Sequence, residues 1–499
     1  MTSSSAIPPD LPIVSLLPEL ATAMEGAGSP AGAKAVVVVA PPGAGKTTAV
    51  PLALLDAPWL AGRKLILLEP RRLAARAAAW RMASLLGEPD VGGTVGYRMR
   101  LDTRVGPTTR IEVVTEGVLT RMLQHDPGLE GVGAVLFDEF HERSLHADLG
   151  LALTLEARDL LRPDLRILVM SATLDPEPVA RLLRQPGAAP VPILRSEGRQ
   201  YPVETIWRDR PVRDTDPRGW IEPAVAATVH RALDETRDEA GGDVLVFLPG
   251  AAEIHRTARE LEDLPAGTEV HILHGSLARE RQDRALAPAP PGRRKVVLAS
   301  AVAETSLTIE GVRIVVDSGL MRVPRFDPSS GMTRLETVRV TRDAADQRRG
   351  RAGRTAPGIC YRLWTAGEDR GLVPTRIPEI READLAPLVL DLARWGSDPS
   401  ELRWLDPPTP STLAAARDLL VSLGALDPAG ALTDHGSRLA ELGAHPRVAH
   451  LLLSARDMGL ASVGCELAAL LGDRDVLRAA GQAADADLRL RVEALRRGG

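Results

Sequence analysis

The sequence predicts an α/β protein in which a parallel sheet with helices on both faces occurs twice in tandem and is followed by a mostly helical region. Short apolar runs alternate with helix-like segments as far as about residue 374. Runs that are apolar throughout are typical of strands buried on both faces of a parallel sheet. The alternation breaks once, at 196–202 and 208–218, where proline, glycine and mixed charge are typical of a connector.

The individual elements follow from this alternation. Strands are predicted before the break at 34–39, 64–68, 110–114, 134–137 and 166–170, and an alanine-rich helix at 73–86. Strands are predicted after it at 243–248, 269–273, 295–299, 312–316 and 358–363. Segment 320–340 has a turn-rich centre and no helical spacing, so it is predicted to be a β-hairpin. Helices are predicted downstream at 385–395, 412–423, 436–442, 447–458 and 461–471.

Length and composition set outer limits. A chain of 499 residues is too long to fold around a single hydrophobic core. Its net charge of −5 gives no overall attraction to nucleic acid, although a local basic groove would be sufficient for binding. Of its 61 basic residues only four are lysines, so a lysine in a phosphate-binding loop is unlike the background. Cys360 and Cys465 lack metal-ligand spacing and are expected to be buried thiols in a reducing cytoplasm. Neither a signal peptide nor a membrane span is predicted.

Residues 36–48, Val-Val-Val-Val-Ala-Pro-Pro-Gly-Ala-Gly-Lys-Thr-Thr, place a glycine-containing loop between a strand and a helix start. In such a P-loop, backbone N–H groups hold phosphates, the lysine meets the β- and γ-phosphates and the threonine hydroxyl binds Mg²⁺. The predicted nucleotide-binding residues are Gly43, Ala44, Gly45, Lys46, Thr47 and Thr48. A chance glycine turn would rarely follow four valines. The loop alone leaves kinase, GTPase and motor open.

Residues 134–143 are an apolar strand that ends in Asp138 and Glu139. At the end of a strand beside a P-loop, Asp138 is within reach of Mg²⁺, and Glu139 can polarise a water for in-line attack on the γ-phosphate. By itself the motif is equally a strand followed by an acidic surface turn. Together with the P-loop it predicts a site of ATP hydrolysis with Mg²⁺ held by Thr47 and Asp138.

Residues 138–141, Asp-Glu-Phe-His, resemble the D-E-x-H box of superfamily 2 helicases, and Glu142-Arg143-Ser144 narrows the resemblance to the DEAH/RHA branch. The bacterial HrpB group shares Ala-Pro-Pro-Gly-Ala-Gly-Lys at 40–46 and Glu-Pro-Arg-Arg-Leu-Ala-Ala-Arg at 69–76. The resemblance implies RecA-like domains at 10–195 and 196–368, a winged-helix-like domain at 369–435 and the start of a helical bundle at 436–499. It also implies a family-specific C-terminal region that this chain would lack, and a strand-guiding role for the hairpin.

The remaining motifs of the family follow in order, at 115–121, 171–173, 247–250, 300–311 and 347–354. Ser171 and Thr173 would couple nucleotide state to domain movement. Contacts to the sugar-phosphate backbone are implied for Arg71, Arg72, Thr115, Gly250, Ser306 and Thr308. Such contacts are independent of base sequence and sensitive to salt. For a single arginine, a surface salt bridge remains the alternative.

The last motif, Gln-Arg-Arg-Gly-Arg-Ala-Gly-Arg at 347–354, also has a chemical interpretation. Arg351 and Arg354 are three residues apart and would share a helix face, as arginine fingers for the developing phosphoryl charge. Gln347 could orient the attacking water. By resemblance His141 joins these residues and Glu139 in the catalytic set. The alternative is a solvated basic helix, although two glycines in such a run indicate close contact across a cleft.

These observations predict an ATP-dependent helicase that moves along a single strand, with RNA favoured and DNA open, and the family resemblance implies the direction 3′→5′. A remodelling ATPase without processive unwinding is the second hypothesis. A nucleic-acid scaffold with a vestigial ATPase is the third, and the intact catalytic set argues against it. The sequence indicates no membrane partner, and it is silent on protein partners, nucleotide choice and oligomeric state.

Overall fold

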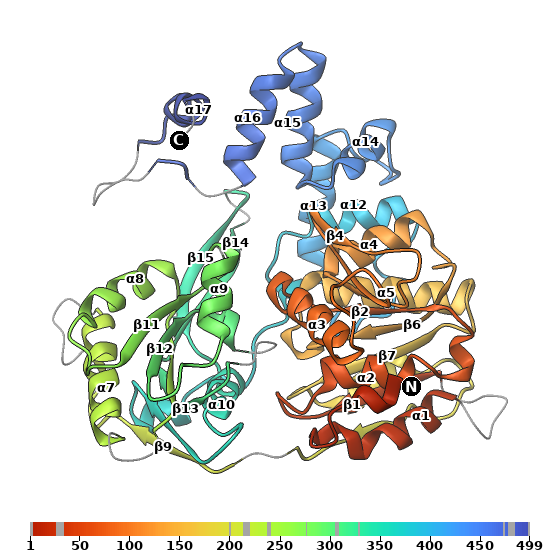
Figure 1. Cartoon of the computed structure of the whole chain (residues 1–499). Helices are drawn as coiled ribbons and strands as arrows, with labels where there is room; N and C mark the ends of the chain where they lie inside the picture. The colour runs from red at the N-terminus through yellow and green to blue at the C-terminus, as the bar shows by residue number, and fades with distance from the viewer. Residues whose placement is uncertain are drawn as a thin grey trace. The chain divides into compact units, whose positions relative to one another are not determined.

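The computed structural model describes residues 3–25, 34–198, 201–212, 220–236, 241–275, 277–304, 309–327, 330–472, 475–477 and 485–497. The chain divides into two compact units. The first comprises Met1–Arg325, Arg334–Glu379 and Arg403–Leu405, and the second Phe326–Thr333, Ile380–Leu402 and Asp406–Gly499. Figure 1 labels the elements of both.

The first sheet of unit 1 has the strand order β4-β3-β5-β2-β6-β7-β1-β8. Its strands are β1 Ala35–Val39, β2 Lys64–Leu68, β3 Val95–Met99, β4 Asp102–Arg104, β5 Ile111–Val114, β6 Val132–Phe137, β7 Arg166–Ser171 and β8 Ile193–Arg195. All pair in parallel except β3 with β4. The predicted strands form the sheet centre. β3, β4 and β8 were missed because they are peripheral strands with little or no apolar run.

Helices cover this sheet because its central strands are apolar on both faces. β6 and β7 are buried at every position. One core cluster contains Val36, Val38 and Leu65, and Val37 and Ile66, which alternate with these residues along their strands, are buried too. The helices are α1 Leu17–Glu25, α2 Lys46–Leu54, α3 Arg72–Leu85, α4 Glu116–His125, α5 Leu145–Leu160 and α6 Pro176–Leu183.

The second sheet of unit 1 is parallel throughout, with the order β11-β12-β10-β13-β16-β9. Its strands are β9 Val203–Trp207, β10 Asp243–Phe247, β11 Thr268–Leu273, β12 Arg294–Ala299, β13 Val312–Asp317 and β16 Gly358–Arg362. The alternation in β10 sends Val244 and Val246 into one core cluster and Leu245 and Phe247 into another. β9 was missed since this half-exposed edge strand lies between the two predicted connector stretches.

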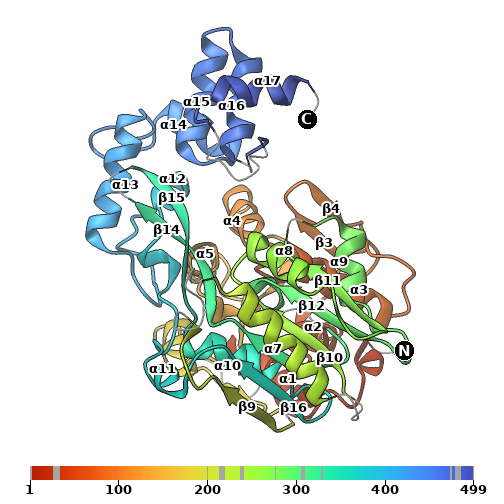
Figure 2. The ribbon, with the colours of Figure 1, turned by 90° about the vertical axis from the view of Figure 1, so that its left-hand side faces the viewer.

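The helices of this second half are α7 Glu222–Glu235, α8 Ala251–Glu260, α9 Arg279–Leu286, α10 Arg342–Gly350 and α11 Ala366–Arg370. α7 and α8 cover one face of the sheet (Figure 2), where Val225, Val229 and Ile254 join the strand residues in the core. Between β13 and α10, strands β14 Leu320–Asp327 and β15 Met332–Arg339 pair as a two-stranded sheet over the segment predicted to be a hairpin.

The second unit is mostly helical, with α12 Ala386–Trp395, α13 Pro410–Ser422, α14 Asp434–Leu442, α15 Pro446–Asp457, α16 Ala461–Gly472 and α17 Leu488–Arg496. Thr409 and Thr433 cap α13 and α14 through their side chains. An antiparallel bridge joins Leu426 to Leu432 between these two helices. The assignment of this region to a winged-helix-like domain and a bundle stays a prediction.

Both cysteines are free thiols, but only Cys360, in β16, is buried. The expectation of two buried thiols is wrong for Cys465, which is exposed on α16. That helix fully buries only Gly464, whose added Cβ would lie 2.5 Å from the Ala455 Cβ on α15, and Cys465 lies on an exposed part of it. Among the described helices, none is both long and apolar enough to cross a membrane.

Candidate nucleotide site

The P-loop connects the end of β1 to the start of α2. Gly43 and Gly45 have φ values of 84° and 97°, in the left-handed region that favours glycine. A Cβ on Gly45 would also lie 3.0 Å from Leu11 Cδ1. The Ala40 N–H donates to the Ser171 carbonyl of β7, and the Ile13 N–H donates to the Ala44 carbonyl, each at 3.1 Å. Hydrogen bonds from β7 and from the N-terminal segment therefore fix the two ends of the loop, and the backbone between them forms a tight turn.

Lys46 is the first residue of α2 and is only 4% exposed. Its Nζ donates to the carbonyl oxygens of Ala40 at 2.6 Å and Pro41 at 3.2 Å. Both acceptors are neutral and belong to the loop itself. The ammonium therefore lies within the turn, where a bound phosphate could take up its charge.

Thr47 and Asp138 come from separate elements and meet at the loop. Asp138 follows β6, where its N–H donates to the Leu68 carbonyl at 3.0 Å. The Thr47 hydroxyl donates to Asp138 Oδ2 at 2.5 Å. Burial and then the neighbouring charge of Glu139 raise the pKa of Asp138 to about 7. The Thr47 hydroxyl and the buried Asp138 carboxylate are neighbouring oxygen donors, the ligand type that Mg²⁺ prefers.

Glu139 is held in a conformation that side chains rarely adopt, with a φ of 48°. It is 5% exposed, and its Oε2 has no hydrogen-bond partner among the described residues. Burial works against ionisation, but positive charges nearby, including those of Lys46 and Arg351, lower the pKa of Glu139 overall. An ionised carboxylate with one free oxygen can accept a proton from water. Backbone strain at such a position is a mark of functional sites.

His141 joins the acidic motif to the segment after β7. The Ala172 N–H donates to His141 Nδ1 at 3.3 Å, and the Nδ1 lies 3.5 Å from Glu139 Oε2. Burial lowers the pKa of His141, and its Nε2 has no partner in the part of the chain that is described. The ring is therefore neutral, accepts through Nδ1 and carries its proton on Nε2.

The arginine motif at 347–354 belongs to the half of unit 1 that contains the second sheet, and it reaches the same site. Gln347 Nε2 donates to Thr173 Oγ1 at 3.2 Å. Arg351 Nε donates to the Glu304 carbonyl at 3.1 Å, and Arg354 Nε lies 3.5 Å from where a Cβ on Gly43 would be.

The predicted shared helix face for the two arginines is wrong. α10 ends at Gly350, so Arg351 and Arg354 occupy the turns that follow it. They reach the cleft because Gly353 packs closely on β9, where an added Cβ would lie 2.6 Å from Val203 Cγ2.

The electrostatics of these arginines favour an anion. Burial lowers the pKa of Arg354 to about 10. Burial, followed by the charge of Arg354, lowers the pKa of Arg351 well below its ordinary value. The buried Arg351, whose ionisation the charge of the half-buried Arg354 opposes, would be stabilised by a bound polyphosphate.

A cavity of about 970 Å³ lies at the P-loop. The predicted site residues that line it are Gly43, Ala44, Gly45, Lys46, Thr47, Thr48, Glu139 and Arg354. Sequence reasoning missed the lining residues Pro8, Asp10, Leu11, Pro12, Arg81, Leu85, Glu310 and Thr355. Of these, only Glu310 falls within a motif, the one at 300–311, and the helical spacing of 73–86 could have directed attention to Arg81 and Leu85.

The residues predicted to contact nucleic acid lie at several separate places in unit 1. Arg71 pairs with Glu142 at 3.0 Å and donates to the Ala301 carbonyl, so it crosses the cleft rather than facing solvent. Arg71 and the exposed Arg72 line a second cavity of about 550 Å³, together with Leu73, Arg76, Gly275, Leu277, Arg279, Gln282, Ala301 and Val302. Thr115 and Gly250 stand at the N-termini of α4 and α8. Ser306 and Thr308 lie outside the described residues.

Residues 22–182 match the family described as DEAD/DEAH box helicase, and residues 226–356 match the helicase conserved C-terminal domain. The ATP-dependent RNA helicase HrpB of Escherichia coli (strain K12) is 47% identical over 463 residues, which are 92% of this chain and 54% of that protein. The probable ATP-dependent RNA helicase DHX35 of Homo sapiens is 33% identical over 455 residues, 87% of this chain and 63% of that protein.

The fold has a counterpart among solved structures. A crystal structure of the Escherichia coli DEAH/RHA helicase HrpB superposes with a TM-score of 0.85 at 44% identity and covers 98% of this chain and 60% of the other. The chain thus spans between 54% and 63% of the length of these curated relatives. The prediction of two tandem RecA-like domains with parallel sheets is confirmed.

Proposed function

The chain belongs to the DEAD/DEAH box helicases, in their DEAH/RHA branch, and from this we propose that it is a nucleic-acid-stimulated ATPase that moves along a single strand and unwinds duplexes. We take RNA as the preferred strand because the curated relatives are named RNA helicases. The direction 3′→5′ is carried over from the resemblance. We place the protein in the cytoplasm, in accord with its two free thiols.

One observation carries the proposal: a single cavity is lined by the P-loop and Glu139 from one sheet's half of unit 1 and by Arg354 from the other half. A site that needs both halves is complete only when they approach. Binding and hydrolysis of a nucleotide can therefore change the spacing of the two halves, which is how a motor converts chemical energy into movement.

The residues divide the hydrolysis between them. The P-loop N–H groups and Lys46 would hold the phosphates, and Thr47 and Asp138 would hold Mg²⁺, which neutralises charge on the β- and γ-phosphates. Glu139, with its free Oε2, would orient and deprotonate the attacking water. Arg351 and Arg354 would stabilise charge on the γ-phosphoryl group, and little rearrangement is needed because Arg351 is held by the Glu304 carbonyl and Arg354 already lines the cavity.

Coupling and strand binding complete the proposal. The Gln347–Thr173 hydrogen bond spans the two halves beside the acidic motif, so it would form or break with the state of the nucleotide. The second cavity, with Arg72 and Arg279, would hold backbone phosphates without regard to base. The domain limits at 195, 368 and 435 belong to this proposal.

The first test is ATP hydrolysis by the wild-type chain with poly-RNA, with single-stranded DNA and with neither. Glu139→Gln keeps the shape of the side chain but removes the base, so we expect kcat to fall by about 10²-fold or more while ATP still binds. Stimulation by RNA, lost in this variant, supports the proposal. Basal turnover without stimulation by either polymer would contradict a motor function for this chain.

Unwinding separates the remaining hypotheses. Displacement of one strand from an RNA duplex with a 3′ overhang, dependent on ATP, supports a helicase. Stimulated turnover without strand displacement would favour the remodelling ATPase.

A further inference from the structure

Residues 373–379, called the strap here, are the last stretch of unit 1 before the chain enters unit 2. The strap begins on the helix that leads into the arginine motif. The N–H of Arg342 donates to the Val373 carbonyl at 2.9 Å, and the N–H of Asp343 donates to the Pro374 carbonyl at 3.1 Å. The strap thus takes up two free N–H groups at the start of α10.

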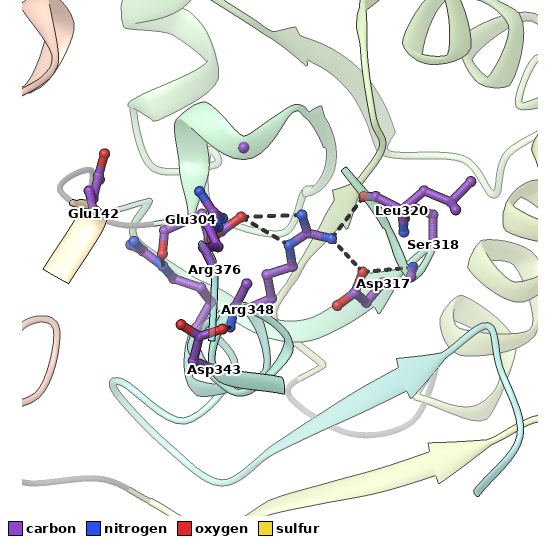
Figure 3. A network of polar contacts seen from close by, with 12 residues as sticks. Glu142, Glu304, Asp317, Ser318, Leu320, Asp343, Arg348 and Arg376 are labelled. Atoms are coloured by element: carbon purple, nitrogen blue, oxygen red, sulfur yellow. Dashed lines mark hydrogen bonds and ion pairs between the residues drawn. The ribbon is translucent and has the colours of Figure 1, made fainter. Parts of the chain in front are cut away.

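The middle of the strap carries Arg376, which pairs with the Glu304 carboxylate through Oε1. Figure 3 shows this carboxylate between Arg376 and Arg348. Arg348 donates to Glu304 Oε2 from Nε and from one terminal nitrogen, each at 3.2 Å. The other terminal nitrogen of Arg348 donates to Asp317 Oδ1 at 2.8 Å. Each Glu304 oxygen therefore has its own guanidinium partner.

Glu304 is 1% exposed and directs its backbone toward the catalytic arginine. Its carbonyl accepts from Arg351 Nε at 3.1 Å. Burial by itself would raise the pKa of Glu304, but the charges of Arg376 and Arg348 outweigh burial and lower it, so the side chain stays ionised. A residue pinned by its side chain offers its carbonyl in a fixed direction.

The end of the strap lies on the other half of unit 1. The Leu145 N–H donates to Glu379 Oε2 at 2.9 Å, and the Glu379 N–H donates to the Arg143 carbonyl at 3.1 Å. These acceptors and donors belong to the turn after the acidic motif and to the start of α5. The strap is therefore attached to both halves that form the nucleotide cavity.

We propose that Arg376 is a positioning residue for hydrolysis, which pins the Glu304 side chain so that the Glu304 carbonyl holds Arg351 toward the nucleotide. This inference rests on the proposed ATPase function. Loss of the Arg376 guanidinium leaves the buried Glu304 Oε1 without this partner. A buried carboxylate oxygen without a partner is unfavourable, so the side chain reorients. Residue 304 then turns, and Arg351 loses the acceptor that orients it.

The test is steady-state ATP hydrolysis by Arg376→Gln. Arg351 acts on charge that develops in the transition state, so misplacing it lowers kcat and leaves the KM for ATP nearly unchanged. We expect kcat to fall by about 10- to 100-fold, as for other small misplacements of a catalytic group. Arg376→Lys keeps the cation and should recover part of this loss. Equal kcat in Arg376→Gln and the wild type would overturn the inference.

A double-mutant comparison separates positioning from general support of the fold. If Arg376 acts through Arg351, then adding Arg376→Gln to Arg351→Gln causes no further loss, whereas independent effects would multiply. Multiplying effects would contradict the inference. The matched control is Arg293→Gln, which removes an exposed arginine–glutamate pair with Glu269 and should leave kcat unchanged. Absence of ATP hydrolysis in the wild type would instead overturn the proposed function, and the inference with it.

Discussion

The glycines and charged side chains of the P-loop show how single residues set the chemistry of this site. Gly43 and Gly45 adopt left-handed φ values, which lets the loop curl so that Lys46 meets two loop carbonyls. Glu139 adopts a left-handed φ without being a glycine. The strain at Glu139 is sustained by the buried strand before it, and it aims a carboxylate with one free oxygen at the cavity.

Gly45→Ala is predicted to weaken nucleotide binding. A left-handed φ costs a residue with a Cβ about 1–2 kcal/mol, and this Cβ would also press on Leu11 at 3.0 Å. We expect the KM for ATP to rise by about tenfold, the factor that 1.4 kcal/mol of lost binding produces. The matched control is Gly87→Ala, which has a φ of 77° but no atom within 4 Å of the added Cβ. It should lower thermal stability and leave the KM unchanged. The same KM in both variants would contradict a role for loop shape.

At the scale of elements, helix ends carry much of the polar organisation of unit 2. Asp384 Oδ1 accepts from the Ala386 N–H at the start of α12 at 2.9 Å. His445 caps α15 through Nδ1, and its Nε2 lies 2.9 Å from Asp384 Oδ2. Since Nδ1 accepts a hydrogen bond, Nε2 carries the proton and donates it to the carboxylate. The starts of two helices are thereby joined by one pair of side chains.

Asp384→Asn is predicted to lower the stability of α12 and α15 in a pH-dependent way. Burial opposes ionisation, but the hydrogen bond from His445 outweighs it and lowers the pKa of Asp384. A carboxyl whose pKa falls on folding stabilises the fold fully above its unfolded pKa, near 3.9, and this stability is lost as pH falls from there through the lower folded pKa. We expect a loss of ~1 kcal/mol at pH 7 that becomes smaller as pH falls below the unfolded pKa. Hydrogen exchange of both helices measures this, with the exposed Asp418→Asn as control. A loss independent of pH would refute the linkage.

At the scale of the whole molecule, the net charge of −5 gives no attraction for nucleic acid, so binding depends on where the arginines lie. In unit 1 four arginines, Arg71, Arg72, Arg76 and Arg279, line one cavity. Arg71 and Arg76 are paired with Glu142 and Asp102, whereas Arg72 is exposed and donates only weakly to the Arg100 carbonyl at 3.4 Å. Arg72 is therefore the member of this group that is best placed to release counterions from a strand.

Arg72→Gln is predicted to weaken binding to poly-RNA and to make it less sensitive to salt. Each phosphate contact on a single strand contributes about −0.7 to the slope of log K against log salt concentration. The variant should therefore have a slope shallower by about 0.7, and the same loss on different base sequences. Fluorescence anisotropy across a salt series measures both quantities. An unchanged slope would remove Arg72 from the binding surface, and Arg293→Gln should match the wild type.

The central strands and the motifs were predictable because each depends on neighbours in the sequence. Apolar runs of strand length identified the central strands of both sheets. The P-loop glycines and Asp138-Glu139 come directly after two of these strands in the sequence. The edge strands β4, β8 and β9, and β3 next to β4, were not predictable in this way. An edge strand is stabilised by its partner rather than by its own apolar pattern, so its sequence resembles that of a loop.

The sequence by itself determined the two-sheet fold and the places of the P-loop and the acidic motif after their strands, because these are set by local pattern. Only the tertiary structure decided which distant residues come together: Leu11 lies against Gly45, Arg81 lines the same cavity as the P-loop, Arg351 and Arg354 follow the end of α10 rather than sharing a helix face, and Arg376 of the strap pairs with Glu304. Such contacts join residues that are up to several hundred positions apart. They depend on packing across the whole unit, which no local pattern of residues records.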